Sequence, residues 1–233
     1  MRRRTFLTGT AASAALLAGC SSGGSTDDGS EASYSVELAP VGEVEFDSVP
    51  ETWVANNGSW ADMGIALGQE PPKGVWLPSR YHTHYYDEIP GVSVDIENVE
   101  KLFGDSGVGK EQFYAMEADL HAMDPNFLVN RGSWSQGDVD EISDEVGPFF
   151  ANSSFSRSYP WHDSYEYYSL YGAFEKLSQV FQQQERYEAF VSLHEEFQSN
   201  LDPHVPAAGE APSAAVVWGG GDPFTLGFGL SLV

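Results

Sequence analysis

The sequence predicts an α/β fold: a Rossmann-like lobe with a largely parallel sheet, a helical connector, and the start of a second α/β lobe. Three observations lead to this prediction. Short apolar runs alternate with amphipathic stretches as far as residue 151. Residues 164–201 contain no proline and carry hydrophobic side chains at helical spacing. A linker at residues 203–212 then leads into a new apolar run at residues 214–218.

The first lobe begins with a strand-rich stretch at residues 36–50. Four apolar runs then predict the strands of the sheet, at residues 53–57, 74–78, 126–130 and 148–151. Because these runs are separated by helical patterns, we expect most of the strands to be parallel.

Three helices are predicted between the strands. Ser59 is placed to cap a helix over residues 60–67, which Gly68 ends. A second helix is expected over residues 111–123, where four hydrophobic residues share one face and Asp124-Pro125 follows: Phe113, Met116, Leu120 and Met123. Residues 138–146 predict a short acidic helix.

The second half of the chain has a different residue pattern from the first. Residues 164–201 predict one long helix or two, with the break at Gln182–Gln184. Only 15 residues follow Trp218, too few for a lobe of ~100 residues, so we expect the natural protein to continue beyond a truncated second lobe. The expected organisation is a signal over 1–20, a flexible acidic tether over 21–33, an N-terminal α/β lobe over 34–160, the connector over 161–202, and the linker with the start of the second lobe over 203–233.

The first twenty residues indicate export and lipid anchoring. Three arginines precede a short alanine-rich run, as in a signal peptide, and residues 3–7 (RRTFL) resemble a twin-arginine signal. Residues 17–20 (LAGC) resemble a lipobox, in which Cys20 is lipidated. The alternative is a free or buried thiol. Cys20 is the only cysteine, so no disulfide within the chain is possible.

The charge balance restricts the partners. Asp and Glu total 35 against 11 Lys and Arg, a formal net charge of −24. Such a chain offers no basic patch for nucleic acid, and the acidic surface resembles that of proteins from salt-loving archaea. A hydrophobic content of 41% nevertheless indicates a packed core, and no run is long enough to predict a transmembrane helix.

No catalytic motif is found, so we expect a non-enzymatic protein without a cofactor. There is no G-x-S-x-G, H-E-x-x-H, C-x-x-C or Walker sequence, and residues 104–110 (GDSGVGK) resemble a phosphate loop only superficially. Asn57 and Asn152 each begin a glycosylation sequon, and Asn152 is the expected acceptor because Asn57 is predicted beside a cleft.

The order of these features resembles the helix-connected class of substrate-binding proteins of ATP-binding-cassette importers, which handles ferric siderophores, haem and cobalamin. Residues 49–68 look like its opening strand and its helix ending in A-L-G. Residues 123–129 (MDPNFLV) look like its L-x-P-D-L-V step, and residues 212–218 (PSAAVVW) look like the start of its second lobe. The resemblance implies a lipid-anchored, monomeric protein on the outer face of the cell membrane. Such a protein delivers a metal chelate to a permease, with an acidic residue of the first lobe at the docking surface: Glu117 or Asp119.

Ligands of such folds lie at the carboxyl ends of the strands. The candidate contacts there are Asn57, Trp60, Arg80, Tyr81, His82, His84, Tyr85, Tyr86, Arg131 and Trp134. Arginine suits the anionic oxygens of a chelate, and tyrosine suits an aromatic ligand.

Several alternatives stay open at this stage. His82 and His84 could bind a metal directly, could touch a chelate through its organic shell, or could belong to a tyrosine-rich surface loop. The run Tyr165–Tyr171 favours helix packing over ligand contact. A non-transport binding lipoprotein and an extracellular enzyme with an unrecognised site are the competing functions.

Overall fold

The computed structural model describes residues 33–104, 107–154, 157–207 and 209–211. They all belong to one compact unit. The expected signal over 1–20, Cys20, the tether as far as residue 32, and the run at 214–218 lie outside the described residues. No helix among the described residues is long and apolar enough to cross a membrane.

A β-hairpin opens the described chain. β1 (Tyr34–Leu38) pairs antiparallel with β2 (Gly42–Phe46), with Tyr34 opposite Phe46. Val36, Leu38 and Phe46 are buried, so one face of the hairpin packs on the core. The strand-rich start predicted for residues 36–50 is confirmed.

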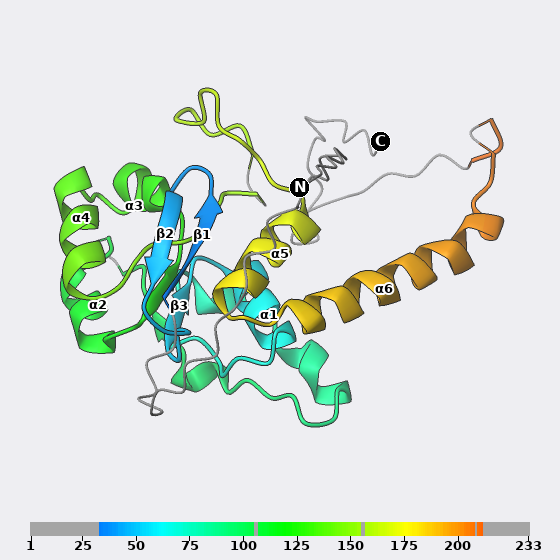
Figure 1. The fold of residues 1–233 in the computed structure, drawn as a ribbon, viewed down its shortest axis with the longest axis horizontal. Helices are drawn as coiled ribbons and strands as arrows, with labels where there is room; N and C mark the ends of the chain where they lie inside the picture. The colour runs from blue at the N-terminus through cyan, green and yellow to red at the C-terminus, as the bar shows by residue number, and fades with distance from the viewer. Residues whose placement is uncertain (1–32, 105–106, 155–156, 208, 212–233) are drawn as a thin grey trace, which may run out of the picture. The chain divides into compact units, whose positions relative to one another are not determined.

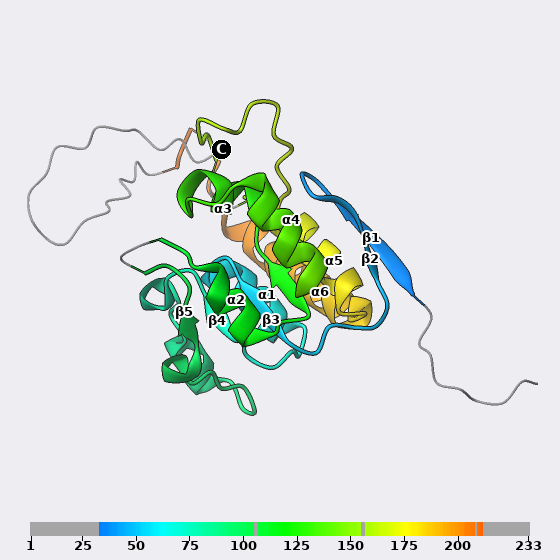
Figure 2. The same cartoon turned by 90° about the vertical axis from the view of Figure 1, so that its left-hand side faces the viewer.

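A four-stranded parallel sheet follows, in the order β5-β4-β3-β6 (Figure 2). The strands are β3 (Trp53–Ala55), β4 (Gly74–Val75), β5 (Glu100–Lys101) and β6 (Leu120–Ala122). A parallel bridge from His121 to Phe149 continues the sheet beyond β6. Counted along the chain, this order is third, second, first, fourth, which is the order of doubly wound nucleotide-binding folds. The predicted α/β fold with a parallel sheet is therefore confirmed.

Two helical layers cover the sheet (Figure 1). On one side lie α1 (Gly58–Ala66) and α5 (Leu170–Val180), together with the hairpin. On the other lie α2 (Lys110–Met116), α3 (Pro125–Arg131) and α4 (Gln136–Glu145). Strand β3 contributes side chains to both layers. Trp53 and Ala55 pack in the hydrophobic core on the α1–α5 side of the sheet, and Val54 packs in the core on the α2–α4 side. Gly64 allows α1 to approach the sheet, since a Cβ atom there would lie 2.3 Å from the Trp53 ring.

The predicted break in the second half of the chain is confirmed. After α5, Gln182 adopts a positive φ of 51°, and α6 (Gln184–Leu201) begins two residues later. The helical part starts at Leu170 rather than at residue 164, because the Ser169 hydroxyl caps α5 by accepting a hydrogen bond from the Gly172 amide.

The prediction for residues 111–130 is wrong in two places. The helix ends at Met116, because Glu117 takes a left-handed conformation, and residues 120–122 form the buried strand β6 instead. Residues 126–130 lie in a helix, not a strand. Asp124 caps α3 by accepting from the Asn126 amide, and Pro125 occupies its first turn, so Asp-Pro begins a helix here.

Two smaller predictions also need correction. The cap of α1 is Asn57, whose side chain accepts from the Trp60 amide, and not Ser59. The run at residues 148–151 contributes only the bridge at Phe149. The acidic helix predicted at 138–146 is confirmed as α4.

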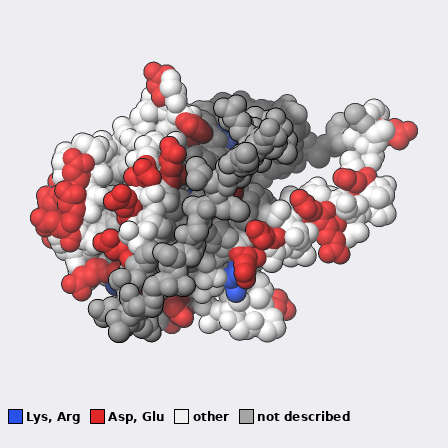
Figure 3. All heavy atoms as spheres, in the orientation of Figure 1, with Lys and Arg blue, Asp and Glu red and all other residues white. Residues whose placement is uncertain are grey.

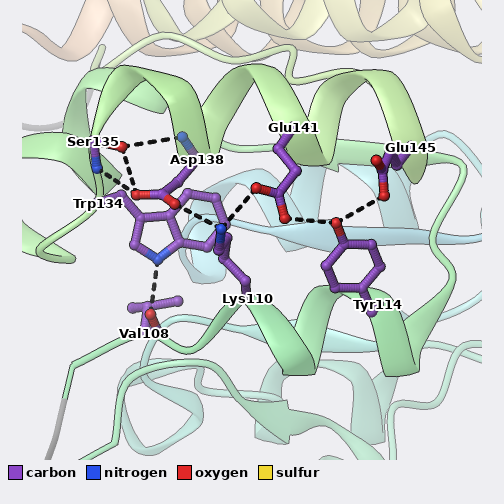
Figure 4. A network of polar contacts seen from close by, with 8 residues as sticks. All are labelled: Val108, Lys110, Tyr114, Trp134, Ser135, Asp138, Glu141 and Glu145. Atoms are coloured by element: carbon purple, nitrogen blue, oxygen red, sulfur yellow. Dashed lines mark hydrogen bonds and ion pairs between the residues drawn. The ribbon is translucent and has the colours of Figure 1, made fainter.

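Lys110 at the start of α2 links that helix to α4 through two ion pairs (Figure 4). Its Nζ atom lies 2.7 Å from Asp138 Oδ1 and 2.8 Å from Glu141 Oε2, and these two hydrogen bonds raise the pKa of Lys110. The Tyr114 hydroxyl donates to Glu141 and to Glu145, which adds a second link between the helices. Acidic side chains gather over this side of the molecule (Figure 3), so Lys110 offsets local like-charge repulsion.

We predict that Lys110→Met lowers the melting temperature by a few degrees in dilute salt, because the carboxylates of α4 lose their cation. The loss should shrink in molar salt, where the repulsion is screened. Thermal unfolding followed by circular dichroism measures it. Lys176→Met is the matched control, since Lys176 makes no ion pair with the described residues. Equal shifts for both variants would contradict the role of Lys110.

The buried side chain of His121 makes the stability of the fold depend on pH. Its side chain is fully buried between Phe113 and Phe149, with Nδ1 2.8 Å from the Gly147 carbonyl oxygen. Nε2 has no hydrogen-bond partner among the residues that the structure describes. Burial lowers the pKa of His121 from 6.5 to about 4. The unfolded chain therefore takes up a proton near pH 6.5, and the folded chain takes it up only near pH 4.

We predict that acid destabilises the chain through this group. Between about pH 6.5 and about pH 4, the free energy of unfolding should fall by up to ~3 kcal/mol more than in His121→Phe, which keeps a ring but cannot titrate. Urea unfolding at a series of pH values measures the difference. His204→Gln, at an exposed position, should follow the unaltered chain. Parallel pH curves for His121→Phe and the unaltered chain would refute the prediction.

Candidate functional site

A cavity of about 340 Å³ opens at the carboxyl ends of the parallel strands. Each strand is followed by residues that line it. They are Asn56, Asn57 and Trp60 after β3; Trp76, Leu77 and Arg80 after β4; Phe103 after β5; Phe127 and Arg131 after β6; and Asn152, Ser153 and Tyr159 after the bridge at Phe149. The cavity thus lies where ligands bind in doubly wound sheets.

The start of α1 forms one wall of the pocket. Asn57 leaves β3 and caps the helix, which fixes its side chain beside the Trp60 amide at 3.2 Å. The Trp60 side chain is buried, and its Nε1 donates to the Asn152 carbonyl oxygen at 3.3 Å. This bond joins two segments that line the pocket, the start of α1 and the loop after Phe149.

Aromatic rings form the opposite wall. Trp76 stacks on Phe103 with ring centroids 4.9 Å apart and meets Phe127 edge-on at 4.6 Å. Tyr159 lies 6.1 Å from Phe127 and stacks on Trp161 at 4.3 Å. A flat, partly apolar ligand can stack against such a wall.

Two arginines line the pocket as well. Arg80 ends the 3₁₀ turn Pro78–Arg80, and Arg131 occupies the last turn of α3. Both are exposed, and neither guanidinium makes a hydrogen bond or ion pair with the described residues. In a chain with 35 acidic residues, this leaves two unused guanidinium groups at one cavity, where they attract anions.

A buried carboxylate holds the loop beside the pocket. Asp124, which is 1% exposed, accepts hydrogen bonds from Ser153 Oγ at 2.8 Å and from the Tyr165 hydroxyl at 2.6 Å. Burial and this carboxylate raise the pKa of Tyr165, so its hydroxyl keeps its proton. Asp124 therefore positions Ser153, which lines the pocket.

Four of the residues proposed from sequence are brought together in the pocket: Asn57, Trp60, Arg80 and Arg131. Tyr81 and Tyr86 are not among its lining residues. Tyr81 is buried against Gly58, its hydroxyl lies 3.2 Å from that of Tyr86, and Tyr86 donates to Asp62. Burial raises the pKa of Tyr81 to about 12. Both tyrosines brace the loop on α1 instead of facing a ligand.

The remaining residues of that loop are exposed outside the pocket. The rings of His82 and His84 lie 6.1 Å apart, and Tyr85 packs on His84 at 4.1 Å. Among the described residues, no group of three or more His, Cys, Asp or Glu side chains could hold a metal ion.

Two candidates are core residues. Trp134 is 6% exposed and donates from Nε1 to the Val108 carbonyl oxygen at 2.7 Å (Figure 4). It packs on Phe113 and is not among the residues that line the pocket. Asn152 is 1% exposed, and its amide donates to the carbonyl oxygens of Ala39 and Glu166. The expectation of glycosylation at Asn152 is therefore wrong for the folded chain, because a buried amide is closed to modification.

The two candidate docking acids lie just before β6, at the amino end of that strand. The Asp119 carboxylate accepts from the Glu51 and Thr52 amides and from the Thr52 hydroxyl, which anchors the approach to β3. The Glu117 carboxylate is exposed and has no hydrogen bond to the described residues.

Sequence reasoning missed most of the aromatic wall. Trp76 and Leu77 were placed inside a strand, but β4 ends at Val75, and Phe127 was placed in a strand that is a helix. Of the tyrosines assigned to helix packing, only Tyr171 lies in α5, where it packs on Phe174. Tyr165 and Tyr167 belong to the loop that carries Tyr159.

Among known proteins, the chain resembles solved structures but matches no family model and no curated protein. The siderophore-binding protein BauB, solved with two molecules of acinetobactin and ferric iron, is 21% identical over 70% of this chain and 51% of its own, with a TM-score of 0.47. The iron-uptake ABC-transporter substrate-binding protein PiuA from Streptococcus pneumoniae is 20% identical over 73% and 52%, with a TM-score of 0.46. A periplasmic solute-binding protein from Mycobacterium smegmatis is 21% identical over 76% and 56%, with a TM-score of 0.49. The chain spans about half the length of these structures.

Proposed function

We propose that this chain supplies the ligand-capturing lobe of an extracytoplasmic substrate-binding protein for an ATP-binding-cassette importer, and that its cargo is a ferric siderophore or a related metal chelate. The proposal rests on two arginines, Arg80 and Arg131, that make no hydrogen bond or ion pair with the described residues and lie beside an aromatic wall at the carboxyl edge of a parallel sheet. No catalytic group is required for this function.

The distribution of charge favours the pocket as the place where this acidic chain binds an anionic ligand. The chain as a whole repels anions, so an anion is retained only where local cations outweigh the surrounding acids. Arg80 and Arg131 supply the local positive charge at the pocket. Each guanidinium carries a fork of hydrogen-bond donors that matches a carboxylate or a catecholate. Among the described residues that line the pocket, none is an aspartate or a glutamate.

The aromatic lining of the pocket favours a ligand that carries flat rings and is held from one side. Its volume, about 340 Å³, is at the lower end for a small-molecule site. Trp76, Phe127 and Tyr159 provide the stacking surface. We propose that a second lobe closes on the ligand from the opposite side, so this lobe alone binds weakly.

The proposed contacts are Asn57, Trp60, Arg80 and Arg131. His82, His84 and Tyr85 form the exposed flank of the loop that begins at Arg80, and they could touch only the outer part of a large chelate. Glu117 is the proposed docking acid for the permease, since the Asp119 carboxylate already binds backbone amides.

Delivery to a permease requires the protein to stay near the membrane. We propose export by the twin-arginine route, lipidation at Cys20, and a monomer held on the outer face by the acidic tether. The large negative charge suits a salt-rich medium, in which self-repulsion is screened.

We predict that ferric tris(2,3-dihydroxybenzoate), an anionic catecholate, quenches the tryptophan fluorescence of the chain, because Trp60 and Trp76 line the pocket. Arg80→Gln and Arg131→Gln should each raise the apparent Kd ~10-fold, as expected for loss of one charge-assisted contact. Titration at constant ionic strength measures the change.

Lys176→Gln is the control, because it removes the same charge outside the pocket lining and should leave the Kd unchanged. Ferrichrome, a neutral hydroxamate, should respond less to either arginine. Quenching that is absent, or that is equal in all variants, would overturn the anionic-chelate proposal. Turnover of an added substrate would favour an enzyme instead.

We predict that Cys20→Ser moves the expressed protein from the membrane fraction to the soluble extracellular fraction, because the thiol that carries the lipid is lost. Immunoblots of washed membranes and medium measure the distribution. Ser21→Ala is the matched control and should remain with the membranes. Retention of Cys20→Ser on the membrane would show that another feature anchors the chain.

A further inference from the structure

Helix α6 has an apolar face that the described residues leave open. Phe190, His194, Phe197 and Leu201 follow one another at spacings of four, three and four, so they share one face of the helix. Its four glutamates lie elsewhere on the helix, at 185, 188, 195 and 196. Although the sequence is amphipathic, no side chain of α6 is fully buried.

Only the first half of this face is covered. Phe174 of α5 packs on Tyr187 and Phe190 with ring centroids 5.5 and 5.6 Å apart, and Tyr171 meets His194 at 4.8 Å. Leu193, beside this contact, is 61% exposed, and further along the helix Phe197 and Leu201 are 59% and 42% exposed. The second half of α6 extends away from the other described elements (Figure 1).

The open face continues into a groove between α1 and α5. A cavity of about 380 Å³ lies there, lined by Ser59, Asp62, Met63, Ala66, Leu170, Tyr171 and Phe174. Tyr171 and Phe174 belong both to this groove and to the contact with α6. The groove and the face therefore form one continuous apolar surface, which we call the α6 surface.

We propose that residues 212–233 of the chain dock on the α6 surface. Asp222 carries the only charged side chain among these 22 residues. Large hydrophobic residues recur at every second position: Phe224, Leu226, Phe228, Leu230 and Leu232. In an extended conformation these five side chains point to one side and can cover an apolar helix face.

The connection is long enough for this docking. Ten residues lie between Leu201 and Pro212. Even with the 3₁₀ turn at Asp202–His204 they can span up to ~30 Å, whereas the face from Phe190 to Leu201 is only ~17 Å long. The segment can therefore turn back along α6 in either direction.

Charge favours this segment over a second copy of the chain. Pairing two α6 helices would bring together two sets of four glutamates, each balanced only by Arg186. Like charges at close range oppose such a dimer. A segment with a single carboxylate side chain adds almost no repulsion.

Photocrosslinking of the full chain tests the proposal. Phe197→p-benzoylphenylalanine places a crosslinker on the open face, and Ser199→p-benzoylphenylalanine places it two residues further on, on the opposite face. An equal mixture of chains of light and heavy isotopes separates crosslinks within one molecule from those between molecules in mass spectrometry. We expect position 197 to crosslink to residues 212–233 of the same molecule, several-fold more than position 199.

Substitutions in the segment supply the second measurement. Leu226→Asp with Phe228→Asp should abolish the crosslink from position 197, whereas Thr225→Asp, on the other side of an extended chain, should retain it. Crosslinks between light and heavy chains would show that a second copy covers the surface. That result, crosslinks to other residues, or equal yields from positions 197 and 199 would each overturn the proposal.

Discussion

Strand β3 lies between β4 and β6, and all three of its side chains are buried. Because alternate side chains of a strand point to opposite faces, Trp53 and Ala55 hold the α1–α5 layer while Val54 holds the α2–α4 layer. A shift of one residue would exchange the two faces and leave Trp53 on the wrong side of the sheet. The same register sets where the chain leaves the sheet, so it places Asn56 and Asn57 at the pocket and the cap of α1 beside them.

The fold class could be predicted because buried strands and amphipathic helices leave different patterns in the sequence. The two patterns become indistinguishable where a short helix runs directly into a short buried strand. Phe113 to Met123 matched a single helical face by coincidence, since Leu120 is buried from a strand and Phe113 from a helix. Asp124-Pro125 was misread for a related reason: the pair stops one helix and starts the next equally well, and only the Asn126 hydrogen bond decides between them.

The site could be predicted in part. The rule that ligands lie beyond strand ends correctly selected Asn57, Trp60, Arg80 and Arg131 as pocket residues. It could not say which side of a loop faces the pocket. The turn at Pro78–Arg80 directs Arg80 to the cavity and sends Tyr81 into the core, where Tyr86 and Asp62 hold it. Trp134 and Asn152 were misjudged because burial depends on packing between layers, which no local pattern encodes.

The pocket combines two arginines that have no described partner with aromatic walls, in a chain of net charge −24. This contrast is the basis for assigning it an anionic chelate. Crystals soaked in ferric tris(2,3-dihydroxybenzoate) and measured at the iron absorption edge test that assignment most directly. We expect an anomalous peak inside the cavity between Arg80 and Arg131, with the catecholate rings against Trp76 or Phe127. A peak at His82 and His84, or none in the cavity, would contradict it.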